Sequence, residues 1–317
     1  MWAFPAFAAA ALALLVERLI GYPRPVLDRI GHPVVWFGKL VTLLDHGLNR
    51  PQGSRSEGRM RGALALVLLL AVAFVPAWAI STLLGQWSKG WVVEALLATS
   101  LIAQKSLRDH VAAVQSGLKS SLAEGRRAVA HIVGRDPAVL DESGVARAAL
   151  ESLAENASDG IVAPVFWYAL LGLPGIAVYK AINTADSMIG HRSARHLHFG
   201  WAAARLDDVV NLPASRLTGL LFAAVTPHRF QQIIDVMRRD APKHQSPNAG
   251  WPEASLAASL QVKLGGPRSY EGERLDLAWM GEGRDRLTAT DIRRGLSLYG
   301  RAITLLLAIT TVLALIF

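Results

Sequence analysis

The run GALALVLLLAVAFVPAWAISTLL, residues 62–84, decides the fold class of this chain. No position in it carries an ionisable side chain. About 20 apolar residues in a helix are enough to cross the ~30 Å hydrocarbon core of a bilayer. The run therefore predicts a transmembrane helix, and we expect an integral membrane protein whose first partner is the lipid bilayer.

Other blocks of the chain are also largely apolar, although 2–19 carries Glu17 and Arg18 near its end and 91–103 carries Glu94. The first of them lacks a basic leader and a small-residue cleavage site, so we expect it to stay on the protein. Two further apolar stretches, 161–182 and 209–226, are interrupted by prolines. We expect them to re-enter the membrane or to be partly buried, with ordinary kinked spans as the alternative. The predicted membrane segments are residues 2–19, 62–84, 91–103 and 302–317.

Basic residues concentrate in segments 18–61, 104–160 and 227–300, whereas the link 85–90 holds only Lys89. Cytoplasmic loops are usually rich in Lys and Arg, so the three basic segments are predicted to face the cytoplasm. Apolar spacing in these segments is helical, and we find no useful strand pattern. We therefore predict an all-α, polytopic integral membrane protein with broken or re-entrant helices and cytoplasmic helical loops. Residues 1–317 are expected to form a single domain.

The composition excludes several classes of protein. The hydrophobic fraction of 52% is too high for a disordered chain. The absence of Cys excludes disulfides, thiolate zinc sites and iron–sulfur clusters. Lys and Arg total 33 against 25 Asp and Glu, giving a net charge of +8, which predicts an anionic partner. Basic patches interleaved with aromatic residues are missing, so nucleic acid is not the expected partner.

Carboxylates and amides gather between residues 151 and 211. Glu151, Glu155 and Asp159 are spaced i, i+4 and i+8, so on an α-helix they would share one face. Like charges at that spacing repel, and a cation or protons would relieve the repulsion. The apolar stretch 161–182 follows directly, which places the three carboxylates at a membrane boundary. A solvated acidic helix end is the alternative interpretation.

Two more pairs repeat the pattern of a carboxylate and an amide three residues apart. These are Asn183 with Asp186 and Asp208 with Asn211. Hard oxygen ligands of this kind suit Mg²⁺ held by one or two carboxylates and substrate phosphates. Neighbouring cations could neutralise the phosphates, although arginines at a membrane interface often only extend towards water. The cations are Lys180, His191, Arg192, Arg205 and Arg216.

At these residues the chain resembles the membrane-bound cobalamin biosynthesis proteins of the CobD/CbiB type. The resemblance runs from about residue 17 to the C-terminus and rests on long motifs in a fixed order. The motifs are GHPVVWFGKL (31–40), ESLAENASDGIVAPVFW (151–167), YKAINTADSMIGHR (179–192), RLDDVVNLPASR (205–216), SPNAGWPEA (246–254) and LGGPRSYEGE (264–273).

The resemblance implies an adenosylcobinamide-phosphate synthase in the inner membrane of a bacterium. Such an enzyme joins adenosylcobyric acid, a corrinoid, to (R)-1-amino-2-propanol or its O-phosphate through an amide bond. ATP is the implied cosubstrate, because a carboxylate must be activated before an amine attacks it. Mg²⁺ is the implied cofactor, since it would neutralise the transferring phosphoryl group. The resemblance leaves open whether the chain forms a homo-oligomer.

The same resemblance turns the polar motifs into candidate site residues. The candidate catalytic residues are Glu151, Glu155, Asp159, Asp186 and Asp207. The candidate metal ligands are Asp159, Asp186 and Asp208. The candidate substrate-binding residues are His32, Trp36, Asn156, Lys180, Asn183, His191, Arg192, Arg205, Asn211, Arg216 and Asn248.

Without the resemblance, two other functions fit the same residues. An intramembrane prenyl-diphosphate transferase also binds Mg²⁺ and diphosphate through Asp-rich motifs. A membrane transporter or sensor without enzymatic activity could use the carboxylates to bind ions. Consumption of ATP together with a covalent corrinoid product would distinguish the synthase from both.

Overall fold

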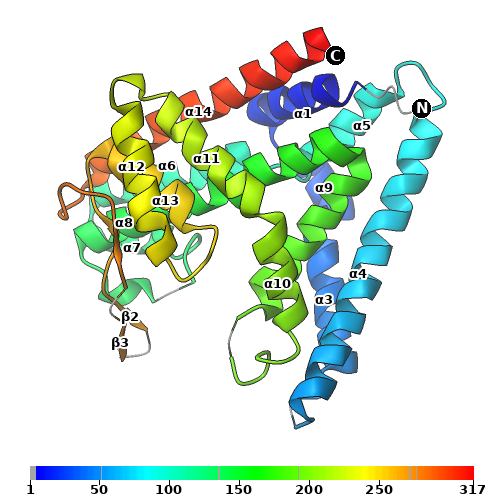
Figure 1. Cartoon of the computed structure of the whole chain (residues 1–317), viewed down its shortest axis with the longest axis horizontal. Coiled ribbons are helices and arrows are strands. Elements are labelled where there is room, and N and C mark those ends of the chain that lie inside the picture. Colours follow the sequence, from blue (N-terminus) through cyan, green and yellow to red (C-terminus); the bar gives the residue numbers. More distant parts are fainter. Residues whose placement is uncertain (1–4, 51, 135, 192, 271–272, 276) are drawn as a thin grey trace. The chain divides into compact units, whose positions relative to one another are not determined.

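The computed structural model describes residues 5–50, 52–134, 136–191, 193–270, 273–275 and 277–317, which are helical over most of their length (Figure 1). We predicted a single domain, and the chain folds into two compact units. The first unit comprises Met1–Ala103, Ala163–Asn211 and Thr310–Phe317. The second comprises Gln104–Val162 and Leu212–Ile309.

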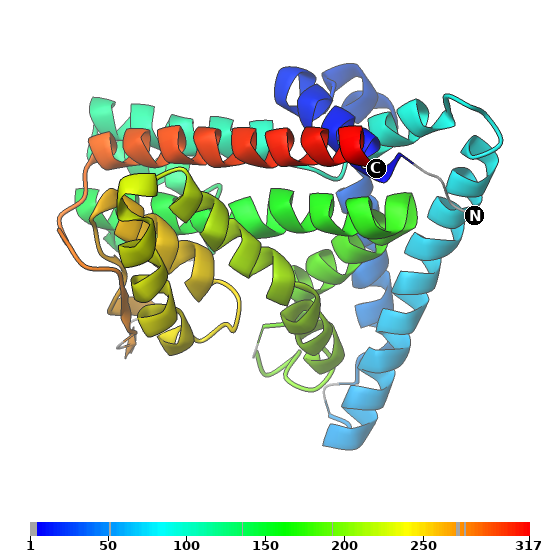
Figure 2. The same ribbon diagram turned by 45° about the horizontal axis from the view of Figure 1, so that its top comes forward.

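The first unit is built around two long apolar helices, α4 and α9, which pack against α3 and α10. Figures 1 and 2 both show α3 beside α4 and α9. The small residues Ala65 and Ala73 of α4 are buried, whereas the large Val67 and Val75 are exposed. In a helix of a soluble protein the large apolar side chains are usually the buried ones. Here they are exposed and the small residues are buried, which suits a helix that contacts lipid on its outer face. The helices are α1 (Ala6–Ile20), α2 (Arg24–Ile30), α3 (Pro33–Leu48), α4 (Arg55–Leu84), α5 (Gly90–Thr99), α9 (Ala163–Ile189) and α10 (Trp201–Val210).

Among the described residues, three helical runs are long and apolar enough to cross a membrane: Arg55–Leu84, Glu142–Ile189 and Ala289–Ile316. The bent pair Ala6–Ile20 with Pro25–Leu48 makes a fourth if it counts as one span. These runs contain the predicted segments 62–84, 302–317 up to Ile316, and most of 2–19, whose residues 2–4 lie outside the described chain. They also contain the stretch 161–182.

Two predicted apolar segments form shorter helices. Helix α5 has 10 residues, fewer than a span needs, because the chain leaves the helix at Ser100 within the predicted segment 91–103. The stretch 209–226 contains α11 (Leu212–Ala224), which has 13 residues. Neither helix is long enough to cross a bilayer by itself.

The interruption that the prolines predicted within the stretch 161–182 lies inside α9. Gly172 has φ +65°, a conformation open mainly to glycine, and Pro174 follows it. The freed backbone N–H of Leu173 donates to Oε1 of Glu94 at 2.9 Å, and the Ser81 hydroxyl donates to the other carboxylate oxygen at 2.8 Å. Glu94 is fully buried. A carboxylate from α5 therefore caps the second half of α9, where the positive end of the helix dipole favours it.

The second unit packs helices around α8 and α13 and adds two short antiparallel ribbons, which the sequence did not predict. Its helices are α6 (Gln104–Ser120), α7 (Leu122–Val129), η1 (Pro137–Val139), α8 (Glu142–Ala157), η2 (Ser158–Val162), α11, η3 (Pro227–Arg229), α12 (Phe230–Asp240), η4 (Ala241–Lys243), α13 (Gly250–Leu260) and most of α14 (Ala289–Ile316). One ribbon pairs β1 (Leu264–Gly265) with β4 (Trp279–Met280), and the other pairs β2 (Arg268–Tyr270) with β3 (Glu273–Leu275).

Candidate functional site

The first unit brings two of the predicted motifs together. Helix α10 packs against α9, so the NxxD motif of α9 and the DDxxN motif of α10 become neighbours. Asp186 interacts electrostatically with both Asp207 and Asp208. The sequence spacing placed each pair on one face of its own helix, and the packing of α9 on α10 joins the two faces. We call these residues, with Asn183 and Asn211, the acid–amide cluster.

A chain of hydrogen bonds holds one carboxylate of the cluster. The buried Tyr179 hydroxyl donates to Oδ1 of Asn211 at 2.8 Å, and Nδ2 of Asn211 donates to Oδ2 of Asp207 at 2.9 Å. The other oxygen of Asp207 is buried and has no hydrogen-bond partner in the part of the chain that the structure describes. The residue can therefore offer one carboxylate oxygen to a ligand or a proton.

Burial and, to a smaller extent, the nearby Asp186 and Asp208 carboxylates together raise the pKa of Asp207 to about 7, although the Asn211 and Asn183 amides oppose the shift. An isolated aspartate has a pKa near 3.9. A carboxyl group with a pKa of about 7 is suited to exchange protons at neutral pH. Such perturbed groups are typical of functional sites, although buried networks also produce them.

Basic groups surround the acid–amide cluster. Lys180 is buried and donates from Nζ to Oδ1 of Asn183 at 3.2 Å. Arg205 forms an exposed ion pair with Asp208 at 3.4 Å. His191 is exposed and acts electrostatically on Asp186. Arg192, another predicted substrate-binding residue, lies outside the described residues.

The predicted residues His32 and Trp36 have local structural contacts. His32 caps α3 by accepting the Val34 N–H at its Nδ1 (3.3 Å). Trp36 donates from Nε1 to the carbonyl oxygen of Ile30 at 2.8 Å. Lys180 also acts electrostatically on His32. This interaction places the His32 loop beside the basic part of the cluster.

The second unit holds the remaining predicted carboxylates. Glu151 is buried, and its Oε1 accepts the backbone N–H of Gly265 at 2.7 Å, so it anchors β1 to α8. Glu155 is exposed, and Asp159 is partly buried. The prediction that all three share one α-helical face is wrong at Asp159, because α8 ends at Ala157 and a π-helical turn, η2, follows. Single π-helical turns are frequent at functional sites.

Three further predicted residues of the second unit have clear partners. Asn156 donates from Nδ2 to the carbonyl oxygen of Ser152 at 2.9 Å. Arg216 donates from Nη1 to Oδ1 of Asn248 at 3.0 Å. The Arg216 guanidinium also lies 4.6 Å from the centre of the Trp251 ring. The predicted residues Arg216 and Asn248, far apart in the sequence, are therefore in direct contact.

The donor chemistry of the acid–amide cluster fits Mg²⁺ in part. Within the described residues, no group of three or more His, Asp or Glu side chains forms a ready metal cage. The free oxygen of Asp207 and the adjacent Asp186 and Asp208 nevertheless supply hard oxygen ligands. Mg²⁺ commonly takes one or two carboxylates and completes its shell with water and phosphate oxygens. The cluster suits that incomplete type of site.

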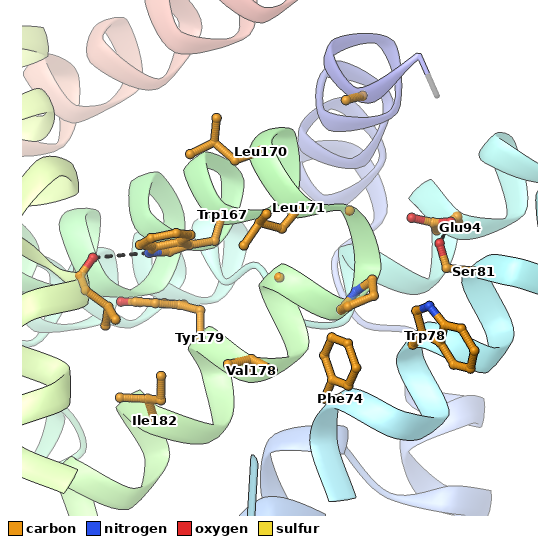
Figure 3. Close-up of a pocket in the computed structure, with 15 residues that line it drawn as sticks. Phe74, Trp78, Ser81, Glu94, Trp167, Leu170, Leu171, Val178, Tyr179 and Ile182 are labelled. Carbon is orange, nitrogen blue, oxygen red and sulfur yellow. Dashed lines mark hydrogen bonds between the residues drawn. The ribbon is translucent and has the colours of Figure 1, made fainter. Parts of the chain in front are cut away.

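An apolar cavity of about 660 Å³ borders the cluster in the first unit. Figure 3 shows Trp167 and Tyr179 at one end of it and Glu94 and Ser81 at the other. Our predicted site residues included neither Tyr179 nor Glu94. The sequence could have indicated Glu94, because an ionisable residue within an apolar membrane segment usually has a functional or structural partner. Tyr179 gave no such signal, since it is not ionised at neutral pH and lies within the apolar stretch 161–182.

Comparisons with known proteins match nearly the whole length of the chain. The model of the family described as CobD/Cbib protein matches residues 10–299. The cobalamin biosynthesis protein CobD of Sinorhizobium fredii is 47% identical, with 98% of each chain covered. The protein of the same name from Rhodobacter capsulatus is 47% identical over 96% of this chain and 98% of its own. That of Brucella anthropi is 45% identical over 96% of each. No solved structure gave a significant match. The chain therefore belongs to the CobD/CbiB family.

Proposed function

We propose that this protein acts in cobalamin biosynthesis by joining adenosylcobyric acid to (R)-1-amino-2-propanol or its O-phosphate. The observation that carries the proposal is the match, over nearly the full length of both chains, to proteins named for cobalamin biosynthesis. The acid–amide cluster supports it, because it combines carboxylates, amides and cations of the kind that phosphoryl transfer requires.

The reaction needs an activated carboxyl group. A carboxylate oxygen of the corrinoid attacks the γ-phosphorus of ATP, ADP leaves, and an acyl phosphate remains. The amine nitrogen then attacks the acyl carbon, phosphate leaves, and the nitrogen loses a proton. The products are the amide, ADP, phosphate and one proton. Bound Mg²⁺, with Asp186 and Asp208 as ligands, would neutralise charge on the phosphoryl group.

The chain's own residues have distinct roles in this proposal. Asp207 accepts the proton of the attacking amine, since its pKa of about 7 allows it to gain and lose protons at neutral pH. Tyr179 and Asn211 hold the Asp207 carboxylate in place through their hydrogen bonds. Lys180 and Arg205 neutralise anionic oxygens of the substrates. Asp159, in the second unit, remains a separate candidate ligand.

The test is conversion of adenosylcobyric acid by the purified protein with amine phosphate and Mg-ATP, followed by mass spectrometry. We expect Asp186→Asn to lower turnover by about 100-fold or more, because it removes a charge that acts directly on the phosphoryl group. Asp159→Asn is expected to lower turnover as well. Asp109→Asn is the matched control, since Asp109 is exposed and, within the described chain, pairs only with Lys105.

Wild-type turnover of Asp186→Asn would contradict the assigned site, and conversion without ATP would contradict the proposed chemistry. Faster conversion with the free amine than with its phosphate would identify the free amine as the substrate, and the proposed reaction would still hold. Substrate flux across a membrane without a covalent product would favour a transporter.

A further inference from the structure

A second cavity, separate from the acid–amide cluster, lies within the second unit. Its volume is about 290 Å³, and it lies where η3, the end of α13 and the middle of α14 meet. Three arginines, Arg229, Arg294 and Arg301, and the imidazole of His228 line it. Among the residues that the structure describes, neither Asp nor Glu lines it. We call it the basic pocket, and it contains none of the residues assigned to amide formation.

Two of the three guanidinium groups are held in position by the protein. Nε of Arg229 donates to Oε1 of Gln232 at 3.1 Å. Nη2 of Arg294 donates to the carbonyl oxygen of Leu260 at 3.0 Å, and its Nη1 donates to Asp291 at 3.2 Å. These contacts leave other N–H groups of both guanidiniums for a ligand, because each guanidinium carries five donors.

Arg301 is different from the other two arginines. It is exposed and makes no hydrogen bond or ion pair within the described part of the chain. It is also the last charged residue before the uncharged run 302–317. Helix α14 is long enough to span a membrane. The basic pocket therefore lies at the point where this helix changes from charged to uncharged residues.

The pocket wall also contains an unsatisfied hydroxyl group. Oγ of Ser259 is buried and has no hydrogen-bond partner among the residues that the structure describes. A buried hydroxyl without a partner is unfavourable, because it loses its hydrogen bonds to water, so such groups usually have a ligand, ion or water. An acceptor oxygen in the pocket would satisfy it.

The backbone beside Ser259 is strained. Gln261 has φ +58°, the only positive φ at a non-glycine residue in the described chain. It ends α13, and its carbonyl oxygen accepts the N–H of Arg284 at 3.2 Å, which holds the conformation. Strain of this kind is retained mainly where the surrounding structure or a ligand requires it.

We propose that the basic pocket binds a phosphate group. Arginine is the preferred residue for phosphate, because its planar fork of N–H donors matches the spacing of the oxygens. Three arginines, no carboxylate in the lining and an unsatisfied hydroxyl select a doubly charged oxyanion over a neutral ligand. The phosphate belongs to an anionic lipid headgroup or to a soluble phosphate ester. Both sources fit, because the pocket lies beside the start of the uncharged run 302–317 and is lined by polar residues.

The experiment is calorimetric titration of the full-length protein in neutral detergent, without Mg²⁺ or nucleotide. One probe is inorganic phosphate, and the other is a short-chain phosphatidic acid, whose phosphate monoester can carry two negative charges. A short-chain phosphatidylcholine is the comparison, because its phosphodiester carries one negative charge and its headgroup has no net charge. We expect saturable binding at one site. Arg301→Gln should weaken it about tenfold, the effect of losing one charged hydrogen bond, and Ser259→Ala severalfold.

The matched control is Arg293→Gln, which removes the same charge from an exposed position of the same helix that does not line the pocket. It should bind like the wild type. Ser259→Ala guards against misfolding, because removing an unsatisfied hydroxyl should not destabilise the protein. Tighter binding of phosphatidic acid would assign the site to a lipid headgroup, and tighter or equal binding of inorganic phosphate would assign it to a soluble ester.

The proposal is overturned if neither phosphate probe binds saturably, or if Arg293→Gln and Arg301→Gln weaken binding equally. It is also overturned if phosphatidylcholine binds as tightly as phosphatidic acid. Inorganic phosphate is also a product of the proposed synthase, but Arg301 and Ser259 lie outside the residues assigned to amide formation. The effect of their variants on binding is therefore independent of the assay for amide formation.

Discussion

At the scale of the residue, Asp207 combines burial with two carboxylate neighbours. Its pKa of about 7 in the folded protein lies above the ~3.9 of an unfolded chain. Between these two values the folded state binds a proton that the unfolded state has released. The contribution of Asp207 to the free energy of unfolding therefore falls as pH rises from about 4 to about 7, and it stays low above that range. Asp207 lowers stability at the pH where we expect it to act.

The variant Asp207→Asn removes this ionisation while keeping the shape of the side chain. We expect it to be more stable than the wild type at pH 8, by about 2 kcal/mol, and nearly equal to it at pH 4. Turnover should fall, because the amide cannot accept a proton. The measurement is the thermal unfolding midpoint in detergent at both pH values, with Asp109→Asn as the exposed control. A variant that is less stable than the wild type at pH 8 would refute the assignment.

The sequence predicted much of the acid–amide cluster but not its hydrogen bonds. The i, i+3 spacing was sufficient to place Asn183 with Asp186 on one helix face. That Tyr179 reaches Asn211 depends on how α9 packs on α10, which spacing within one helix does not encode. The same limit applies to Glu151, whose partner, the Gly265 N–H, is more than a hundred residues away.

At the scale of the element, the two halves of α9 depend on Glu94. The break at Gly172 leaves the Leu173 N–H without a helical partner, and the Glu94 carboxylate accepts it. The half of α9 that follows carries Tyr179 and Asp186. The prolines of the stretch 161–182 predicted an interruption there. The sequence could not predict the cap, because the capping residue comes from another helix.

We expect Glu94→Ala to lower the unfolding midpoint, with a loss of about 1–3 kcal/mol, because it leaves a buried N–H and the Ser81 hydroxyl unpaired. Glu94→Gln keeps an acceptor oxygen for Leu173 and should retain most of the stability. Thermal unfolding and turnover of both variants check this. If alanine and glutamine are equally destabilising, or neither is, Glu94 does not act as a cap.

At the scale of the whole molecule, helix α4 sets the orientation of the first unit. It has 30 residues, a length of about 45 Å at 1.5 Å per residue, enough to cross a bilayer. Near its N-terminal end, a Cβ on Gly62 would overlap the carbonyl oxygen of Phe199, and Arg59 lies 4.6 Å from the Trp201 ring centre. The link between α9 and α10 is therefore at the basic end of α4. Ser88 follows the opposite end.

If α4 crosses the membrane, Ser193 in that link and Ser88 must lie on opposite sides. The basic residues of segment 18–61 predict that the Ser193 side is cytoplasmic, where ATP is available. Both serines are exposed, and the chain has no native Cys, so single Ser193→Cys and Ser88→Cys variants form a matched pair. An impermeant maleimide should label Ser193→Cys only in inside-out vesicles and Ser88→Cys only in intact spheroplasts. Labelling of Ser193→Cys in spheroplasts would reverse the orientation, and labelling of both from one side would show that α4 does not cross.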